Sequence, residues 1–262
     1  MSGIEMTNKA YREHEGVSRS QFNILLSKTP LHFKYAQEHK EDDTLALLEG
    51  RAIHKMILEP DTFYDEFAIA PKVDRRTISG KAEYEDFIKN LQDKEIITDE
   101  SYTKAVEMAK ALKQNPDAVK FLTGEHEQSF FWTDAETGEP CKVRPDVLTE
   151  VDGIKYIVDY KTTDSCADGA FERSVRKYGY KFQAGMYREG VFQNTFDEYK
   201  FAFVAQEKKP PYASRLYICT DGFVNEGYQQ FRKAITIYHD CKTLDVWSGY
   251  EEEILIEEED IV

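Results

Sequence analysis

The chain has 262 residues, 41% of them hydrophobic, and a formal net charge of −15 at pH 7. This length and apolar content suit one large domain with a real core, and no apolar run approaches the roughly 18 residues of a transmembrane helix, which we therefore exclude. The acidic charge does not exclude a nucleic-acid partner. Residues 251–262 hold seven acids and no base, so the rest of the chain carries only −8.

Location and redox state follow from the N-terminus and the cysteines. The first sixteen residues, MSGIEMTNKAYREHEG, lack the apolar core of a signal peptide. The cysteines are scattered and form no C-x-x-C pair, which predicts a reduced, cytoplasmic protein without a zinc ribbon or an iron–sulfur cluster. They are Cys141, Cys166, Cys219 and Cys241.

The first half of the chain is predicted to be mainly helical. Ser18 or Ser20 is suited to cap a helix that begins with an apolar-periodic run, and Pro30 opens a second helix. Residues 43–59 form a clear helix ended by Pro60. A polar, turn-rich loop is expected over 71–81, followed by two further helices near 81–92 and 99–114.

The second half alternates between strand and helix patterns. Residues 126–134, the strand bearing Asp146, and residues 154–161 predict a three-stranded meander. A helical pattern over 168–193 precedes two further strands and a long last helix, at 199–206, 213–219 and 221–247. The fold class is therefore α/β, or α+β, with a mixed sheet flanked by helices. We expect one domain over 1–250 and an acidic tail over 251–262.

The most informative local signal is the Asp152-Gly153 pair, which predicts a two-residue β-hairpin turn. Position 151 would then face 154, which sets Asp146 opposite Asp159 and Arg144 opposite Lys161. Opposed and alternate residues share one face of the sheet. We expect the other face to be apolar, with Val143, Val147, Ile154, Tyr156, Val158 and Tyr160.

Two carboxylates and a lysine on one face predict a site for a divalent cation. Like charges directly opposite each other cost free energy unless a group between them compensates. Asp146 and Asp159 would bind Mg²⁺, or Mn²⁺ in its place, and the Tyr160 carbonyl could add a ligand. Lys161 would orient or deprotonate a water that attacks a phosphodiester. Mixed charges on an exposed hairpin face are also common without any such role.

Two other features are compatible with the same site but are ordinary by themselves. His54 shares a helix stripe with Leu and Gly residues, where a core histidine bound to a backbone group is the usual finding. Gln183 and Tyr187 lie four residues apart and therefore share a helix face. A half-buried polar pair of this kind is common.

Four motifs, in order, resemble those of the RecE-type exonucleases, the exodeoxyribonuclease VIII catalytic domains of the PD-(D/E)xK nuclease superfamily. They are G50-R-A-I-H54, R144-P-D146, D159-Y-K161-T-T and Q183-A-G-M-Y187. The similarity extends to V17-S-R-S20, H54-K-M-I-L-E-P60, D74-R-R-T-I-S-G-K81 and W132-T-D-A-E-T-G138. It covers about residues 11–247.

The resemblance implies a role for each matching residue. His54 would be a metal ligand with Asp146 and Asp159, and Lys161 would be the catalytic lysine. Glu127, on the preceding strand, would assist the metal site. Gln183 and Tyr187 would line the active site near the DNA. The second acid is Asp where Glu is commoner, which the RecE branch tolerates.

DNA-contacting residues are predicted with alternatives left open. Ser18 and Ser20 could bind a 5′ phosphate at a helix start, as similar serines do in the related lambda exonuclease, or could simply cap the helix. Arg75, Arg76 and Lys81 could hold phosphates or lie in a solvated loop. The basic run from Arg173 to Lys181 is open to the same two interpretations.

The resemblance implies a Mg²⁺-dependent exonuclease that degrades linear double-stranded DNA from 5′ to 3′. It further implies phage or prophage origin, a homo-oligomeric ring around DNA, and a RecT-type annealing protein as partner. An endonuclease or single-strand nuclease on the same fold is one alternative. A catalytically silent DNA-binding module is another.

Overall fold

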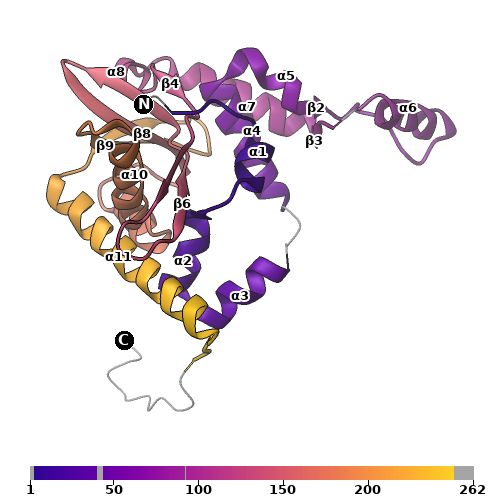
Figure 1. Ribbon diagram of the computed structural model, residues 1–262. Coiled ribbons are helices and arrows are strands. Elements are labelled where there is room, and N and C mark those ends of the chain that lie inside the picture. Colours follow the sequence, from indigo (N-terminus) through magenta and orange to yellow (C-terminus); the bar gives the residue numbers. More distant parts are fainter. Residues whose placement is uncertain (1–2, 40–43, 92, 251–262) are drawn as a thin grey trace, which may run out of the picture.

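The computed structural model describes residues 3–39, 44–91 and 93–250. These residues form a mixed α/β fold in which helices cover a central sheet (Figure 1), as the sequence predicts. The predicted acidic tail at 251–262 lies outside the described residues. None of the described helices is both long enough and apolar enough to cross a membrane.

The N-terminal helices begin at the capping signals that the sequence contains. They are α1 (Asn8–Glu13), α2 (Arg19–Ser27), α3 (Pro30–Glu38) and α4 (Leu45–Leu58). Ser18 is the N-cap of α2, and its backbone N–H donates to the Gln21 side chain at 2.8 Å. Pro30 occupies the first turn of α3, where its missing N–H costs nothing. The Thr44 hydroxyl caps α4.

Helix α6 (Ile78–Lys89) lies on an extension that projects away from the central sheet (Figure 1). The parallel pair β2 (Phe67–Ile69) and β3 (Glu95–Ile97) forms its base. Before it come the short 3₁₀ helix η1 (Pro60–Thr62) and α5 (Phe63–Glu66), and after it α7 (Asp99–Leu112) and α8 (Pro116–Phe121). The sequence predicts α6 and α7 but not the two short strands.

A five-stranded mixed sheet forms the centre, in the order β10-β9-β8-β7-β4. Its strands are β4 (Glu125–His126), β7 (Val147–Val151), β8 (Ile154–Thr163), β9 (Lys200–Glu207) and β10 (Ser214–Ile218). Strands β8 and β9 are parallel, and the other neighbouring pairs are antiparallel. The parallel pair requires a long connection, which α9 (Ala170–Lys177) and α10 (Tyr180–Thr195) provide.

The predicted three-stranded meander is wrong, because the chain changes sheets within it. Strands β5 (Phe130–Thr133) and β6 (Pro140–Val143) pair with each other, and β6 pairs with β1 (Val17–Ser18), in a separate three-stranded sheet. The break between β6 and β7 contains Pro145, whose nitrogen has no hydrogen to donate to a ladder. The predicted strand over 126–134 is likewise divided into β4 and β5.

The hairpin register is confirmed for the β7–β8 ladder. Its five pairs run from Val151–Ile154 at the turn to Val147–Val158. Asp152 and Gly153 have φ angles of 55° and 77°, both in the left-handed region that such a turn requires. The ladder ends one position short of Asp146 and Asp159. The predicted pairs Asp146–Asp159 and Arg144–Lys161 are therefore not part of it.

Both faces of the central sheet are buried. Because successive side chains of a strand point to opposite faces, they belong to two different hydrophobic cores. Tyr156, Val158 and Tyr160 of β8 pack against α4, α7 and α8, whereas Ile157 belongs to the core formed with α2, α10 and α11 (Asp221–Leu244). The predicted apolar set requires two corrections. Val143 lies in the second of these cores because its strand is in the other sheet, and Ile154, beside the turn, is 39% exposed.

Helices α10 and α11 approach closely behind the sheet. A Cβ on Gly185 would lie 2.0 Å from the Tyr228 backbone nitrogen, and one on Gly227 would lie 1.9 Å from the Lys181 carbonyl oxygen. Only glycine fits at these two crossings. The close packing fixes α10, which faces the functional end of β8.

Candidate active site

Asp146 reaches the site because the chain leaves the ladder there. The residue is 8% exposed and lies just before β7. Its Oδ2 accepts a 2.7 Å hydrogen bond from the Tyr160 backbone N–H. The two-residue turn predicts that Asp146 is the direct cross-strand neighbour of Asp159. The ladder ends before this pair, and the Asp146 side chain instead accepts a hydrogen bond from the backbone of the next residue, Tyr160.

His54, Glu127 and Asp146 form a cluster that could hold a metal ion. One ligand atom from each residue lies within 4.8 Å of the other two. His54 Nε2 is 2.9 Å from Asp146 Oδ2, and His54 Nδ1 is 3.5 Å from Glu127 Oε1. Helix α4 supplies the histidine, and the segments flanking β4 and β7 supply the acids. The three predicted residues are therefore brought together.

The donor set of this cluster fits a divalent cation. The two carboxylates are the hard oxygen ligands that Mg²⁺ and Mn²⁺ prefer, and the imidazole is a borderline nitrogen ligand that is commoner on transition metals. Adjacent ligands of an octahedral ion with bonds of about 2.1 Å lie about 3 Å apart. The 2.9 Å separation between His54 Nε2 and Asp146 Oδ2 is compatible with that spacing.

Asp159 and Lys161 form a second group beside this cluster. Asp159 is 1% exposed, and its Oδ2 lies 2.5 Å from the Lys161 ammonium. Its Oδ1 accepts a hydrogen bond from the Gln183 amide of α10. Lys161 also lies 5.0 Å above the Tyr180 ring. Asp159 is outside the three-residue cluster, so its predicted role as a metal ligand stays a prediction.

The two groups are electrostatically linked. Burial and the nearby Asp146 carboxylate raise the pKa of Asp159 to about 6. Burial would raise the pKa of Asp146, but His54, Lys161 and the Tyr160 N–H together outweigh it and hold this pKa below its usual value. The pKa of His54 lies well above its usual value, because Asp146 and Glu127 overcome the effect of burial. Lys161 has a raised pKa despite burial, because Asp159 and Asp146 stabilise its charge.

Arg144 holds Glu127 in the cluster, a role that the sequence analysis did not assign. Its Nε lies 2.7 Å from Glu127 Oε2 and donates to the Glu127 carbonyl at 3.1 Å. Glu127 has a φ of 52°, and its N–H donates to the Asp146 carbonyl at 3.0 Å. Arg144 therefore faces Glu127 and not Lys161. Pro145 is the sequence signal that could have shown the strand break.

An open groove of about 720 Å³ leads to the cluster. His54, Glu127 and Arg144 line it together with residues of α1 and of the first turns of α4. Figure 1 shows α1 beside α4, on the side of the molecule from which the α6 extension leaves. Two of the three cluster residues, His54 and Glu127, are therefore reached from the groove.

The remaining predicted residues on α10 and β8 lie beside the site. Tyr187 of α10 packs against the core, and burial, with nearby Tyr11, Asp159 and Asp146, raises its pKa well above the usual value. The Tyr160 side chain is buried on the other face, where its hydroxyl donates to Gln206 at 2.7 Å. A metal bond to the Tyr160 carbonyl stays a prediction.

Ser18 and Ser20 are engaged with each other at the start of α2. Their hydroxyl oxygens are 3.1 Å apart, and the Ser18 hydroxyl donates to the Gln21 side chain at 2.8 Å. Ser18 therefore has the predicted capping position. Phosphate binding by either serine stays a prediction, because these contacts already account for their arrangement.

Arg75 and Arg76 are not brought to the metal cluster. They precede α6 on the extension that Figure 1 shows projecting from the body. The Arg75 guanidinium stacks 4.3 Å from the Tyr84 ring, and the Arg76 side chain is 95% exposed beside Asp74. Any DNA contact by these residues would be remote from the cluster.

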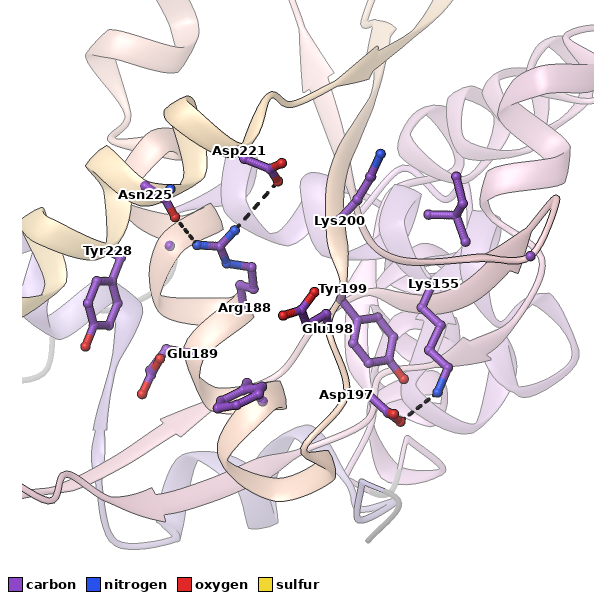
Figure 2. A pocket seen from close by; sticks show the side chains of 14 residues that line it. Lys155, Arg188, Glu189, Asp197, Glu198, Tyr199, Lys200, Asp221, Asn225 and Tyr228 are labelled. Atoms are coloured by element: carbon purple, nitrogen blue, oxygen red, sulfur yellow. Dashed lines mark hydrogen bonds and ion pairs between the residues drawn. The ribbon is translucent and has the colours of Figure 1, made fainter.

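A second hollow of about 930 Å³ lies between α10, α11 and the first residues of β8 and β9 (Figure 2). Two of its basic residues, Lys155 and Arg188, have polar partners among the lining residues. Lys155 lies 2.6 Å from Asp197, and Arg188 donates to Asn225. None of the predicted site residues lines this hollow.

Comparison with known families identifies the fold. Residues 18–259 match the family described as "PDDEXK-like domain of unknown function (DUF3799)". The chain belongs to this family. The PD-(D/E)xK superfamily assignment made from the four motifs is thereby confirmed, whereas the RecE-type assignment within it is not tested. Proteins of this superfamily generally use divalent metals, in agreement with the cluster at His54.

One solved structure agrees with the fold. A structure described as "Putative exonuclease" from Eubacterium rectale has a TM-score of 0.65 and 17% identity, covering 97% of this chain and 96% of its own. The structure of SSO0001 has a TM-score of 0.32 and 14% identity, covering 72% of this chain and 86% of its own. No curated protein matches the chain significantly. Family and fold together support a nuclease.

Proposed function

We propose that this protein is a Mg²⁺-dependent deoxyribonuclease that degrades linear double-stranded DNA from its ends. The observation that carries the proposal is the meeting of His54, Glu127 and Asp146 within 4.8 Å of one another, beside an open groove that His54 and Glu127 line. Lys161 and Asp159 lie on the adjoining strand. These are the parts that metal-assisted phosphodiester hydrolysis requires.

His54, Glu127 and Asp146 would hold the cation, with Asp159 as a further acid beside it. The bound cation would polarise the scissile phosphate and lower the pKa of a bound water. Lys161 keeps its proton, because its raised pKa reflects the neighbouring carboxylates. Its ammonium would therefore position the attacking water and stabilise the charge that develops on the phosphate oxygens.

Gln183 orients Asp159 through the amide hydrogen bond, and Tyr187 lies further along the same helix. Both would line the active site near the DNA. Ser18 and Ser20 would receive a terminal 5′ phosphate, and Arg75 and Arg76 would contact DNA beyond the groove.

The biological setting is proposed on the resemblance to the RecE-type exonucleases. Residues 1–250 would form one catalytic domain with 5′-to-3′ polarity. The protein would act in the cytoplasm of a bacterial host, in phage-type recombination, as a homo-oligomeric ring with a RecT-type annealing protein. A ring that encircles DNA would provide processivity without strong electrostatic attraction, which agrees with the net charge of −15.

The substrate experiment compares a 5′-phosphorylated linear duplex with a covalently closed circle in Mg²⁺. We expect the linear duplex to be degraded and the circle to survive. Cleavage of the circle would instead favour an endonuclease. Degradation of single strands alone would favour a single-strand nuclease.

The Asp159→Ala variant separates catalysis from binding. We expect it to bind duplex ends and not to degrade them. Activity equal to that of the unaltered protein would remove Asp159 from the proposed site. DNA binding without hydrolysis by the unaltered protein, at saturating Mg²⁺, would favour a catalytically silent module.

A further inference from the structure

The short helix α1 places two cations along the catalytic groove. Lys9 and Arg12 line the same hollow as His54 and Glu127, and both residues are exposed. They are three positions apart, so they lie on one face of the helix. Neither belongs to the motifs that resemble those of the RecE-type exonucleases.

Other cations along this groove are neutralised by acids. Lys55 lies 3.0 Å from Glu59 and 2.7 Å from Glu66. Arg51 lies 2.5 Å from Glu95, and Arg144 lies 2.7 Å from Glu127.

Lys9 and Arg12 are different, because their side chains have no ion pair or hydrogen bond within the part of the chain that the structure describes. Glu13 is the neighbouring acid on α1, and it too is exposed. The two cations therefore remain available to an anionic polymer that enters the groove.

A buried lysine holds α1 in this position. Lys142 is 5% exposed, and its ammonium donates to the carbonyls of Tyr11, Arg12 and His14, at 3.0, 3.2 and 2.5 Å. Its three hydrogens thus meet three acceptors at the C-terminal end of the helix, where a cation is also favoured by the helix dipole. The position of Arg12 is therefore fixed by a charge-assisted contact.

Two further contacts anchor the segment around α1. Ile4 and Ser129 exchange backbone hydrogen bonds of 2.9 and 3.0 Å before the helix begins. After it ends, the His14 ring stacks on Phe131 at a centroid distance of 3.7 Å. Helix α1 has no buried residue of its own, so these contacts, and not core packing, hold it at the groove.

We propose that α1 is a phosphate-binding wall of the catalytic groove, in which Lys9 and Arg12 contact the backbone of the DNA strand near the metal cluster. The inference rests on the proposed function and deepens it by assigning residues to the substrate path. Phosphate contacts of this kind position a nucleic acid without reading its sequence. The cations would therefore affect affinity equally for all sequences.

The test measures binding of a 5′-phosphorylated duplex as a function of salt, with Asp159→Ala present to prevent degradation. Adding Lys9→Ala and Arg12→Ala should lower the slope of log K against log salt concentration by about 2 in magnitude, since each phosphate contact contributes about 0.9. The matched control is Lys110→Ala with Lys113→Ala, two exposed lysines of and just beyond α7 that line a different hollow. The control should keep the original slope.

Activity measurements with Asp159 intact separate the two hypotheses. If the unaltered protein degrades linear duplex DNA, the Lys9/Arg12 variant should have a raised KM and an unchanged kcat. An unchanged salt slope and KM in an active enzyme would overturn the role of α1 while leaving the nuclease in place. Failure of the unaltered protein to degrade DNA would overturn the proposed function instead, and a slope change in binding would still support α1 as a phosphate contact.

Discussion

The charged residues at the two ends of the β7–β8 hairpin differ in burial. At the turn, Asp152 is exposed and lies 2.8 Å from the exposed Lys120 ammonium. At the open end, Asp146 and Asp159 are 8% and 1% exposed, beside Lys161. Exposed ion pairs contribute little to stability, whereas buried like charges are costly. The charges at the turn are therefore replaceable, and those at the open end indicate function.

The largest expected effect is on catalysis at the open end. Asp146→Ala removes a ligand from the proposed cation site, which is worth several kcal/mol of transition-state stabilisation, so DNA hydrolysis should fall by about 10³-fold. The rate of linear duplex degradation in Mg²⁺ measures the effect.

Asp152→Ala is the matched control, because it removes an aspartate from the same hairpin at its exposed end. Its rate should equal that of the unaltered protein. Comparable losses in both variants would contradict the distinction between the two ends.

A smaller loss is expected when Arg144 no longer holds Glu127. Residues that orient a metal ligand typically change metal affinity by about 10–100-fold. Arg144→Ala should therefore raise the Mg²⁺ concentration needed for half-maximal activity by about that factor, and excess Mg²⁺ should restore most of the rate.

Arg144→Lys keeps the charge but cannot reproduce the planar guanidinium geometry. Its Mg²⁺ concentration for half-maximal activity should therefore lie between those of the unaltered protein and Arg144→Ala. A loss of activity that no Mg²⁺ concentration restores would show that Arg144 does more than position Glu127.

At the turn, the expected effect is on stability alone. Gly153 has a φ of 77°, and a Cβ there would meet no atom within 4 Å. Gly153→Ala should therefore cost about 1–2 kcal/mol, from backbone conformation and not from a clash. Urea denaturation measures this change, and the nuclease rate of the folded variant should stay the same. An unaltered free energy of unfolding would argue against the left-handed turn.

The smallest effect is expected for the exposed ion pair. Lys120→Ala should change the free energy of unfolding by about 1 kcal/mol or less, and added salt should reduce the difference. The same denaturation series provides the measurement. A loss of several kcal/mol that does not depend on salt would contradict the small contribution to stability expected of this exposed ion pair.

The sequence predicted those parts of the hairpin that depend on local chemistry. The Asp-Gly pair determines the turn, and the turn determines the register of the five ladder pairs. Ser18 and Pro30 likewise marked the starts of α2 and α3, because capping depends on residues within one helical turn. The resemblance to the RecE-type motifs predicts that His54 and Asp146 share one site, and the structure places His54 Nε2 2.9 Å from Asp146 Oδ2.

The remainder depended on contacts between distant segments. The Glu127 backbone conformation, its ion pair with Arg144 and the change of sheet before β7 all arise from tertiary packing. Pro145 was a local sign of the last of these, because it cannot donate to a ladder. The docking of α1 through Lys142 had no sequence signal, since the three carbonyls it binds belong to the backbone.

The central claim is that the buried charges at the open end bind a divalent cation. The most direct test is a crystal structure of the protein soaked in saturating Mn²⁺, with anomalous diffraction used to locate the ion. The account predicts an anomalous peak bonded to His54, Glu127 and Asp146, beside Asp159. The absence of a peak there, or a peak held only by other residues, would contradict it.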